Sequence, residues 1–321
     1  MRTEILHGRD GVAAAVQHLL AGEAVALPTE TVYGLAADAL NATAVLKIFE
    51  AKERPRFDPL IVHLPDRDWL ERIAAVEPAN ASIVQALIAR FWPGPLTLVL
   101  PRQQVVPDVV TAGLETVAVR WSAHPLFCEI IAAFASPLAA PSANRFGRIS
   151  PTAAGHVQAE LEGRIPLIVD GGATTHGLES TIVAVRNGAI EILRHGPVTA
   201  EELAEFAQVR IVSGGARPEA PGQLPSHYAP RTRLMLVPKL ATFTAGRGVN
   251  LGALFWRGSA DQDFAVSRTL SPTGDIKEAA ANLFRCLREL DAENLDLIVA
   301  EYVPEEGVGA AIMDRLRRAA L

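Results

Sequence analysis

Short apolar runs that end in polar residues alternate along most of this chain with longer stretches of helical periodicity, and this alternation constrains the fold most strongly. The runs of strand length lie at residues 24–27, 60–64, 96–100, 116–121, 138–141, 167–170, 180–185 and 190–193. The helical stretches begin near residues 10 and 41 and recur at 79–91, 125–134, 152–161 and 199–206. The pattern predicts an α/β fold with a mixed, strand-rich sheet.

Residues 213–232 contain seven glycines and prolines and no periodic apolar pattern, so they predict an extended connector. Beyond the connector, apolar runs alternate again with helical patterns, which predicts a second, smaller Rossmann-like α/β domain. The runs lie at 234–237, 249–256 and 297–300, and the helical patterns at 275–290 and 310–320. We therefore divide the chain into a first domain at 1–210, a connector at 211–232 and a C-terminal domain at 233–321.

The composition limits the classes of partner and the cellular compartment. A net charge of -6 argues against a protein that holds nucleic acid by bulk electrostatics, although it allows a local basic cleft. The two cysteines, Cys128 and Cys286, form no Cys-x-x-Cys motif, which suits a reducing cytoplasm. The charged N-terminus lacks the apolar core of a secretory signal, and the longest apolar region, 129–141, is shorter than the roughly 20 residues of a membrane span. We therefore expect a cytoplasmic protein without a membrane segment.

Several common catalytic motifs are missing from the sequence. None of the four lysines follows a glycine, so there is no Walker-type phosphate loop. The nearest approach to a dinucleotide fingerprint, at 307–312, lacks its third glycine and is better explained as the start of a helix. The eight histidines form no metal-binding pair, and no Gly-x-Ser-x-Gly is present. Zinc hydrolysis and the usual serine nucleophile are therefore both disfavoured.

The stretch at residues 24–35 places polar side chains directly after an apolar strand. Pro28 cannot donate to a sheet ladder, so the three residues after it should leave the sheet. Thr29, Glu30 and Thr31 then have side-chain oxygens that are free to meet a ligand. Alternatively, the stretch is a strand followed by an ordinary polar turn.

Polar groups recur wherever an apolar strand or helix stops, which is how α/β proteins build clefts. This series comprises Thr29, Thr31, Lys52, Arg54, His63, Arg120, Ser142, Asn144, Ser150, Ser180, Thr181 and Arg194. Guanidinium groups suit phosphate or carboxylate oxygens, and the hydroxyls and the amide can fix a ligand's orientation. Together these groups indicate a pocket for a polyanion and a small zwitterion, without a covalent nucleophile.

The members of this series also have structural explanations. The cations at 52–56 follow a helix, where the helix dipole alone favours positive charge. An arginine at a strand end can form a salt bridge at the rim of the sheet, and Pro-Ser-Ala-Asn at 141–144 can cap a turn. His63 and His124 taken singly are compatible with buried structural histidines.

Short motifs follow one another in a fixed order from residue 28 onward. They are Pro28-Thr-Glu-Thr-Val-Tyr-Gly-Leu35, Lys52-Glu-Arg54-Pro55, Arg120, Pro141-Ser-Ala-Asn144, Ser150-Pro-Thr, Asp170-Gly-Gly172, Glu179-Ser-Thr-Ile182 and Arg194. Together they resemble the YrdC-type threonylcarbamoyl-AMP synthases. His227-Tyr-Ala-Pro230 is similar to the linker of the longer, two-domain members, and Asp314-Arg-Leu-Arg-Arg to their C-terminal ending. The resemblance implies a YrdC-like mixed, twisted sheet.

The resemblance also implies an activity, partners and a set of site residues. The enzyme would make L-threonylcarbamoyladenylate and pyrophosphate from L-threonine, bicarbonate and ATP, with Mg²⁺ held mainly by the phosphates and not by side chains. The product would serve N6-threonylcarbamoyladenosine formation in tRNA through a downstream threonylcarbamoyl transferase complex, and tRNA is itself a candidate partner. L-Threonine would bind to Thr31, His63, Arg120, Ala140 and Ser180. The nucleotide would bind to Lys52, Arg54, Asp58, Thr116, Ser142, Asn144, Ser150 and Arg194, with Tyr228 of the linker folded over the pocket as a lid.

Three positions depart from the pattern of this family. Asp58 stands where the family often has asparagine beside the nucleotide, and its charge should weaken phosphate binding unless Arg54 or Arg56 pairs with it. Ser122 and His195 each replace a proline that the family often has shortly after an arginine, and both are tolerable changes in loops.

Two other functions remain as alternatives. A basic, concave cleft would suit double-stranded RNA or tRNA without catalysis, although the acidic net charge and the lack of interleaved aromatic residues argue against it. A carbamoyltransferase of the hydrogenase-maturation type shares the YrdC-like domain. Such a protein should carry cysteine-rich zinc segments, which this sequence lacks.

Overall fold

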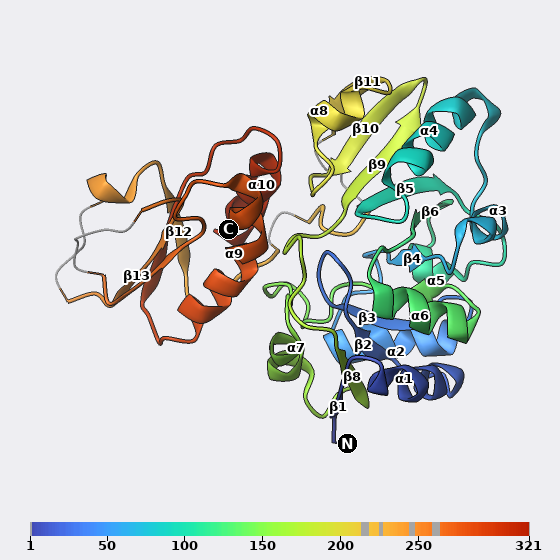
Figure 1. The fold of residues 1–321 in the computed structure, drawn as a ribbon, viewed down its shortest axis with the longest axis horizontal. Coiled ribbons are helices and arrows are strands. Elements are labelled where there is room, and N and C mark those ends of the chain that lie inside the picture. Colours follow the sequence, from blue (N-terminus) through green and yellow to red (C-terminus); the bar gives the residue numbers. More distant parts are fainter. Residues whose placement is uncertain (1, 213–217, 225–226, 244–247, 259–263, 321) are drawn as a thin grey trace.

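The computed structural model describes residues 2–212, 218–224, 227–243, 248–258 and 264–320. These residues form a larger part with a mixed sheet and a smaller part with a parallel sheet (Figure 1). Two helices of the smaller part, α9 (Ile276–Asp291) and α10 (Gly309–Ala319), lie between its sheet and the larger part. The predicted α/β class and the second, smaller α/β unit are therefore confirmed.

The larger part is built on an eleven-stranded sheet in the order β1-β8-β2-β3-β7-β4-β6-β5-β9-β10-β11. Its strands are β1 (Glu4–His7), β2 (Val25–Leu27), β3 (Gly34–Asp38), β4 (Ile61–His63), β5 (Leu96–Pro101), β6 (Thr116–Arg120), β7 (Leu138–Ala139), β8 (Leu167–Asp170), β9 (Thr181–Arg186), β10 (Ala189–Arg194) and β11 (Gln208–Ile211). β6 pairs with β4 in parallel and with β5 in antiparallel orientation, so the sheet is mixed. Because some neighbouring strands, such as β1 and β8 or β5 and β9, are distant in sequence, this order brings remote strand ends together.

Helices cover both faces of this sheet. Successive side chains along a strand point to opposite faces, so one strand can contribute to the core on each side. Val25 and Leu27 pack with α1 (Asp10–Leu20) and α6 (Pro125–Phe134), whereas Ala26 belongs to the core on the other face. The helices that contribute to this other core are α2 (Ala42–Lys52), α3 (Leu70–Ile73), α4 (Ala81–Phe91), α5 (Asp108–Thr111), α7 (Ala154–Leu161) and α8 (Ala200–Ala204). None of the helices in the described part of the chain is long and apolar enough to cross a membrane.

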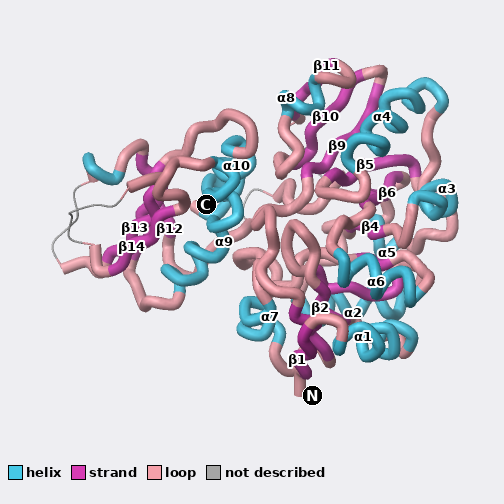
Figure 2. Tube along the Cα trace, in the orientation of Figure 1, coloured by secondary structure: helices cyan, strands magenta, loops and turns pink. Residues whose placement is uncertain are grey.

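On the α1 and α6 face, part of the sheet is covered by the connector instead of a helix. Ile61, Ala118 and Ile182, from β4, β6 and β9, form an apolar cluster with Ala220 of the connector. Figure 2 shows loop segments running between the two parts of the molecule. The predicted limits at 210 and 232 stay a prediction, and residues 213–217 and 225–226 of the connector lie outside the described residues.

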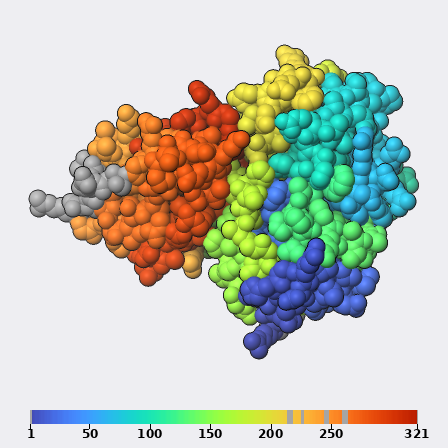
Figure 3. All heavy atoms as spheres, viewed as in Figure 1, coloured from blue at the N-terminus to red at the C-terminus, as the bar shows by residue number. Residues whose placement is uncertain are grey.

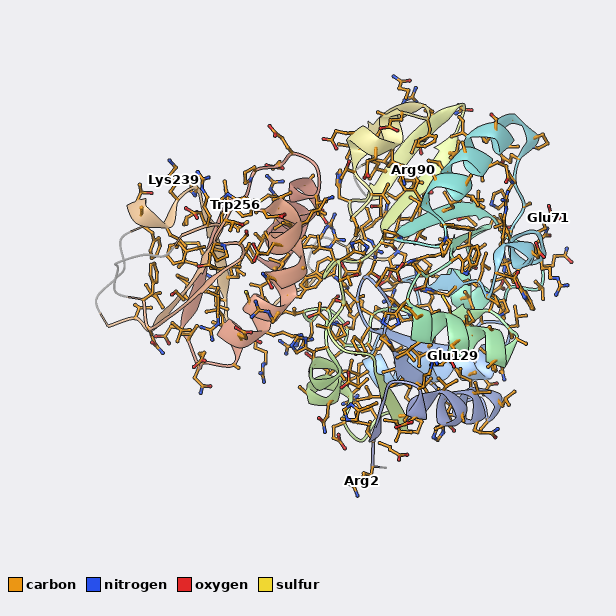
Figure 4. All side chains as sticks on the ribbon, in the orientation of Figure 1. Arg2, Glu71, Arg90, Glu129, Lys239 and Trp256 are labelled. Atoms are coloured by element: carbon orange, nitrogen blue, oxygen red, sulfur yellow. The ribbon has the colours of Figure 1, made fainter. Side chains whose placement is uncertain are left out.

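The smaller part has a parallel sheet in the order β12-β15-β13-β14. Its strands are β12 (Leu234–Val237), β13 (Leu251–Phe255), β14 (Val266–Thr269) and β15 (Leu297–Glu301). Lys239 and Trp256, which follow β12 and β13, mark its carboxyl edge (Figure 4). Phe284 of α9 belongs to a core that also contains Val32 and Tyr228, so the two parts share apolar packing where they meet (Figure 3).

Four strands lack the apolar run on which the strand prediction relied. β3 is Gly-Leu-Ala-Ala-Asp, a sequence of low β-propensity, yet it lies inside the sheet between β2 and β7. Its two neighbours supply the pairing that its own sequence does not indicate. β1, β11 and β14 are edge strands with partly exposed side chains, which need fewer apolar residues.

Candidate active site

A cavity between the strand ends of the larger sheet and the connector has about 530 Å³ of space, part of which is open to solvent. The site residues of the sequence analysis that line it are Thr31, Arg54, His63, Arg120, Ala140, Ser142, Ser180, Arg194 and Tyr228. They come from the ends of different strands, from the region after α2 and from the connector. The expected convergence of strand ends into one hollow is therefore present.

Arg120 and Thr31 form one wall of this cavity. Arg120 is the last residue of β6, and its Nη1 donates to Oγ1 of Thr31 at 2.9 Å while its Nε donates to the Gly94 carbonyl at 3.1 Å. Oγ1 of Thr31 lies 2.8 Å from Oγ1 of Thr29. A guanidinium held in this way beside a hydroxyl group suits a carboxylate ligand.

The side-chain oxygens of Glu30 are engaged by protein groups, in contrast to the expectation that they are free. Its Oε1 lies 2.7 Å from Nη2 of Arg120 and accepts from the Ala123 amide at 3.1 Å, and its Oε2 accepts from the Ser122 hydroxyl at 2.5 Å. Burial alone would raise the pKa of this carboxyl, but attraction to Arg120 and the Ser122 hydrogen bond lower it to about 2. Ser122, a departure from the family pattern, thus holds the carboxylate that supports Arg120.

His63 ends β4 and lies against α6, where its ring centroid is 4.9 Å from that of Phe127. Burial, with the nearby charge of Arg120, lowers the pKa of His63 to about 3, so the imidazole is neutral near pH 7. Its Nδ1 has no hydrogen-bond partner among the described residues. His63 therefore lines the cavity as a neutral imidazole.

Arg194 ends β10 and connects the sheet to the connector. Its Nε and Nη2 donate to the Ser180 carbonyl at 3.1 and 3.0 Å, and Nη2 also donates to the Ser180 hydroxyl at 3.0 Å. Its Nη1 donates to the carbonyl of Pro221 at 3.2 Å. The Ser180 hydroxyl is also 2.7 Å from Oγ1 of Thr97, so it is held from two sides.

Lys52 stands behind the cavity wall and shapes it from there. This last residue of α2 is buried, and its Nζ donates to the carbonyl oxygens of Ser142 and Asn144 at 2.6 and 2.5 Å. The Asn144 amide in turn donates to the carbonyl oxygens of Arg145 and Arg148, both at 2.8 Å. Burial lowers the pKa of Lys52 well below its usual value. In this structure Lys52 and Asn144 therefore organise the loop that carries Ser142.

Arg54 pairs with Asp58. Without such a partner, the charge of Asp58 should weaken phosphate binding. Nη2 of Arg54 lies 2.8 Å from Oδ2 of Asp58 and donates to the Pro59 carbonyl at 2.9 Å. Burial raises the pKa of Asp58, against the pull of Arg54. The charge of Asp58 is thus compensated inside the wall.

Ser150 contacts a residue of the cavity wall, whereas Thr116 lies away from the cavity. The Ser150 hydroxyl donates to Oε1 of Glu179, a carboxylate that lines the cavity. Thr116 is the first residue of β6, whereas Arg120 is the last. The two residues are therefore about 13 Å apart along the extended strand. Thr116 lines a different hollow together with Arg186. The structure therefore does not bring Thr116 into the site.

Tyr228 is buried in the described part of the connector and faces the smaller part of the molecule. Its ring is stacked on Phe284 of α9 at 5.7 Å between centroids, and the guanidinium of Arg315 from α10 lies 4.9 Å from its centroid. Burial raises the pKa of Tyr228 to about 12, and its hydroxyl has no hydrogen-bond partner among the described residues. The connector thus closes one side of the cavity through this ring.

The charges around the cavity leave an excess of positive charge. The carboxylates beside the cavity pair with arginines, in the pairs Glu30–Arg120, Asp58–Arg54 and Glu179–Arg315, and Arg315 also pairs with Asp314 at 2.7 Å. Arg194 forms no ion pair within the described part of the chain, whereas burial disfavours the charged form of Lys52 by lowering its pKa. The site can therefore bind a polyanion.

The side chains beside the cavity can be examined as ligands for a metal ion. No group of three His, Cys, Asp or Glu side chains suited to a metal is found among the residues that the structure describes. The carboxylates beside the cavity are already engaged by arginines. Mg²⁺ prefers hard oxygen ligands, of which the phosphate oxygens of a nucleotide are one kind, and its presence stays a prediction.

Glu179 and Arg315 belong to the site, but the sequence analysis did not assign them to it. Both stand in motifs on which the resemblance rests, Glu179 directly before Ser180 and Arg315 in the C-terminal ending. A signal for Arg315 is visible in hindsight, because it shares one face of α10 with the apolar Ile312 and Ala319. A charged residue on an apolar helix face indicates a buried partner.

Comparison with known proteins gives matches over nearly the whole chain. Residues 17–196 match a family model described as "Telomere recombination", and residues 198–321 match "Threonylcarbamoyl-AMP synthase, C-terminal domain". The chain is 42% identical to the threonylcarbamoyl-AMP synthase of Pyrococcus abyssi, over 93% of this chain and 90% of that protein. It is 41% identical to the threonylcarbamoyl-AMP synthase of Bacillus subtilis, over 96% of this chain and 92% of that protein. The crystal structure of P. abyssi Sua5 complexed with L-threonine superposes with a TM-score of 0.90 at 38% identity, covering 99% of this chain and 98% of that one.

Proposed function

Because the chain belongs to the threonylcarbamoyl-AMP synthase family, we propose that it forms L-threonylcarbamoyl-AMP and pyrophosphate from L-threonine, bicarbonate and ATP. The observation that carries this proposal is the convergence of Arg120 and Arg194, from the ends of β6 and β10, on one cavity that also presents hydroxyl groups. The two cations suit the carboxylate of an amino acid and the phosphates of a nucleotide.

L-Threonine would occupy the side of the cavity that Arg120 forms. Its carboxylate would accept hydrogen bonds from Arg120 and Thr31, which are already held in place. Its amine would not be repelled by His63, because burial keeps that imidazole neutral. The hydroxyl of Ser180 and the backbone of Ala140 complete this side of the cavity.

The nucleotide would occupy the side that Arg194 forms. Arg54, Ser142, Arg194 and Tyr228 line the cavity there, while Lys52 fixes the loop that carries Ser142. Asp58, Asn144 and Ser150 support this wall from behind. Mg²⁺ would neutralise the triphosphate and be held by its oxygens.

The reaction needs positioning more than covalent catalysis. The threonine amine attacks the carbon derived from bicarbonate and forms a carbamate, with loss of water. A carbamate oxygen then attacks the α-phosphorus of ATP. The bond between this phosphorus and the oxygen that bridges it to the β-phosphate breaks, and pyrophosphate leaves with that oxygen. Fixed guanidinium groups stabilise the charge that develops on the phosphoryl oxygens, and a shared cavity brings the reacting atoms into line.

The product is a mixed anhydride, so it must be consumed by an enzyme that transfers the threonylcarbamoyl group to a nucleophile. We propose that the acceptor is an adenosine of tRNA, in N6-threonylcarbamoyladenosine formation, through a separate transferase complex. Direct contact of this chain with tRNA and a cytoplasmic location stay predictions.

The test is a pyrophosphate-release assay with ATP and bicarbonate, with and without L-threonine. Release should depend on L-threonine, and mass spectrometry of the mixture should find the threonylcarbamoyl adenylate. Glycine in place of L-threonine is the control for simple amine chemistry. Equal release without any amino acid would falsify the assignment of threonine.

A further inference from the structure

We infer that Arg315, in the last helix of the smaller part, is a positioning residue for the nucleotide, because it neutralises a carboxylate in the wall of the cavity. Arg315 lies on α10, which belongs to the smaller part, yet its side chain is 0% exposed. Its Nε donates to Oε2 of Glu179 at 2.9 Å, across 136 positions of sequence. The inference rests on the proposed function, since it concerns the binding of ATP.

Glu179 is the carboxylate whose charge matters here. It lines the cavity, and its other oxygen accepts the hydrogen bond from the Ser150 hydroxyl. An unpaired carboxylate at this position would repel a triphosphate and would carry an uncompensated buried charge. The positive charge of Arg315 compensates the buried charge of Glu179 and so reduces its repulsion of a triphosphate. Because Arg315 holds one oxygen of Glu179, the other oxygen keeps the Ser150 hydroxyl in a fixed orientation.

Arg315 also contacts two other segments beside the proposed nucleotide site, the turn after Arg194 and the connector. Its Nη2 donates to the carbonyl of His195, the residue that follows Arg194, at 2.9 Å. Its guanidinium lies over the ring of Tyr228, 4.9 Å from the centroid. One side chain from α10 therefore contacts the cavity wall, the turn after Arg194 and the connector.

Attachment of the smaller part does not depend on Arg315 alone. Arg288 of α9 donates to the carbonyl oxygens of Ile149 and Ser150 and pairs with Glu160 at 3.2 Å. A continuous apolar core also joins the two parts. Removal of the Arg315 charge should therefore act on nucleotide binding before it separates the two parts.

The test uses the full chain and compares Arg315→Met with Arg315→Lys and with the double variant Arg315→Met/Glu179→Gln. Arg315→Met should raise the KM for ATP about tenfold, while the KM for L-threonine stays within about twofold. The double variant lacks both charges and should recover most of the ATP affinity. Arg315→Lys keeps a charge opposite Glu179 and should stay within about threefold of wild type. Arg317→Met is the matched control, because Arg317 is an exposed neighbour on α10 that pairs only with Glu305 in the described structure.

The inference is overturned if the double variant binds ATP as weakly as Arg315→Met, or if ATP and L-threonine lose affinity by the same factor. If Arg315→Met does not fold, the comparison of Arg315→Lys with the double variant decides, since both should retain ATP affinity. Calorimetric titration with ATP alone measures these affinities without turnover. It therefore separates a failure of this inference from a failure of the proposed reaction, which the pyrophosphate assay on the wild-type chain reports.

Discussion

Nη2 of Arg120 lies 2.7 Å from Oε1 of Glu30, and both side chains are buried beside the cavity. This ion pair fixes the guanidinium that also donates to Thr31. We therefore predict that Glu30→Gln raises the KM for L-threonine about tenfold and lowers the free energy of unfolding by about 3 kcal/mol, because it removes one partner of a buried pair. Steady-state kinetics and urea unfolding measure the two effects. The control is Glu129→Gln, which affects an exposed pair with Arg9 and should change stability by less than about 1 kcal/mol.

The same carboxylate predicts an acid-dependent loss of stability. The pKa of Glu30 is lowered in the folded protein from 4.5 to about 2, so its contribution is complete above pH 4.5 and is lost as the pH falls toward 2. The contribution amounts to about 3 kcal/mol over this range. Urea unfolding of the wild type and Glu30→Gln between pH 5 and 3 measures it. Parallel pH profiles of the two proteins would contradict the assigned pKa.

Lys52 provides a third prediction, because its Nζ donates to two backbone carbonyls of the loop that carries Ser142. Lys52→Met leaves both carbonyl oxygens without this donor, so it should destabilise the protein by about 2 kcal/mol and also raise the KM for ATP. Thermal unfolding and steady-state kinetics report the two quantities. Lys47→Met, at a half-exposed pair with Glu23, is the matched control. An unchanged unfolding temperature with a raised KM would show that Nζ turns to the phosphates instead.

Tyr228 should act through its ring and not through its hydroxyl. The ring contacts Phe284 and Arg315, while the hydroxyl has no partner among the described residues. We expect Tyr228→Phe to retain kcat/KM for ATP within about twofold, and Tyr228→Ala to lose about tenfold or more. Tyr302→Ala, at a tyrosine that is 45% exposed, controls for the loss of a ring elsewhere. A Phe variant as impaired as the Ala variant would assign the effect to the hydroxyl.

Local sequence patterns determined the fold class, most of the central strands and the residues at their ends. Arg120 and Arg194 were predicted as cavity residues because each follows an apolar run, and the structure places both on the cavity. These features depend on hydrophobic period and on the chemistry of single residues, which neighbouring positions in the chain already specify. The glycines and prolines of residues 213–232 indicated the connector, and the family motifs added the expected ligands and the role of Tyr228.

Only the tertiary structure decided which charged groups pair. Glu30 supports Arg120, Lys52 turns to backbone carbonyls 90 and 92 positions away, and Arg315 reaches Glu179 from the last helix. Likewise, β3 exists because β2 and β7 lie on either side of it, and Thr116 falls at the far end of its strand. The energy of a buried ion pair or a strand pairing depends on a partner brought close by the fold. A local pattern can therefore indicate that a charged residue such as Arg315 is buried, but it does not identify the distant residue that pairs with it.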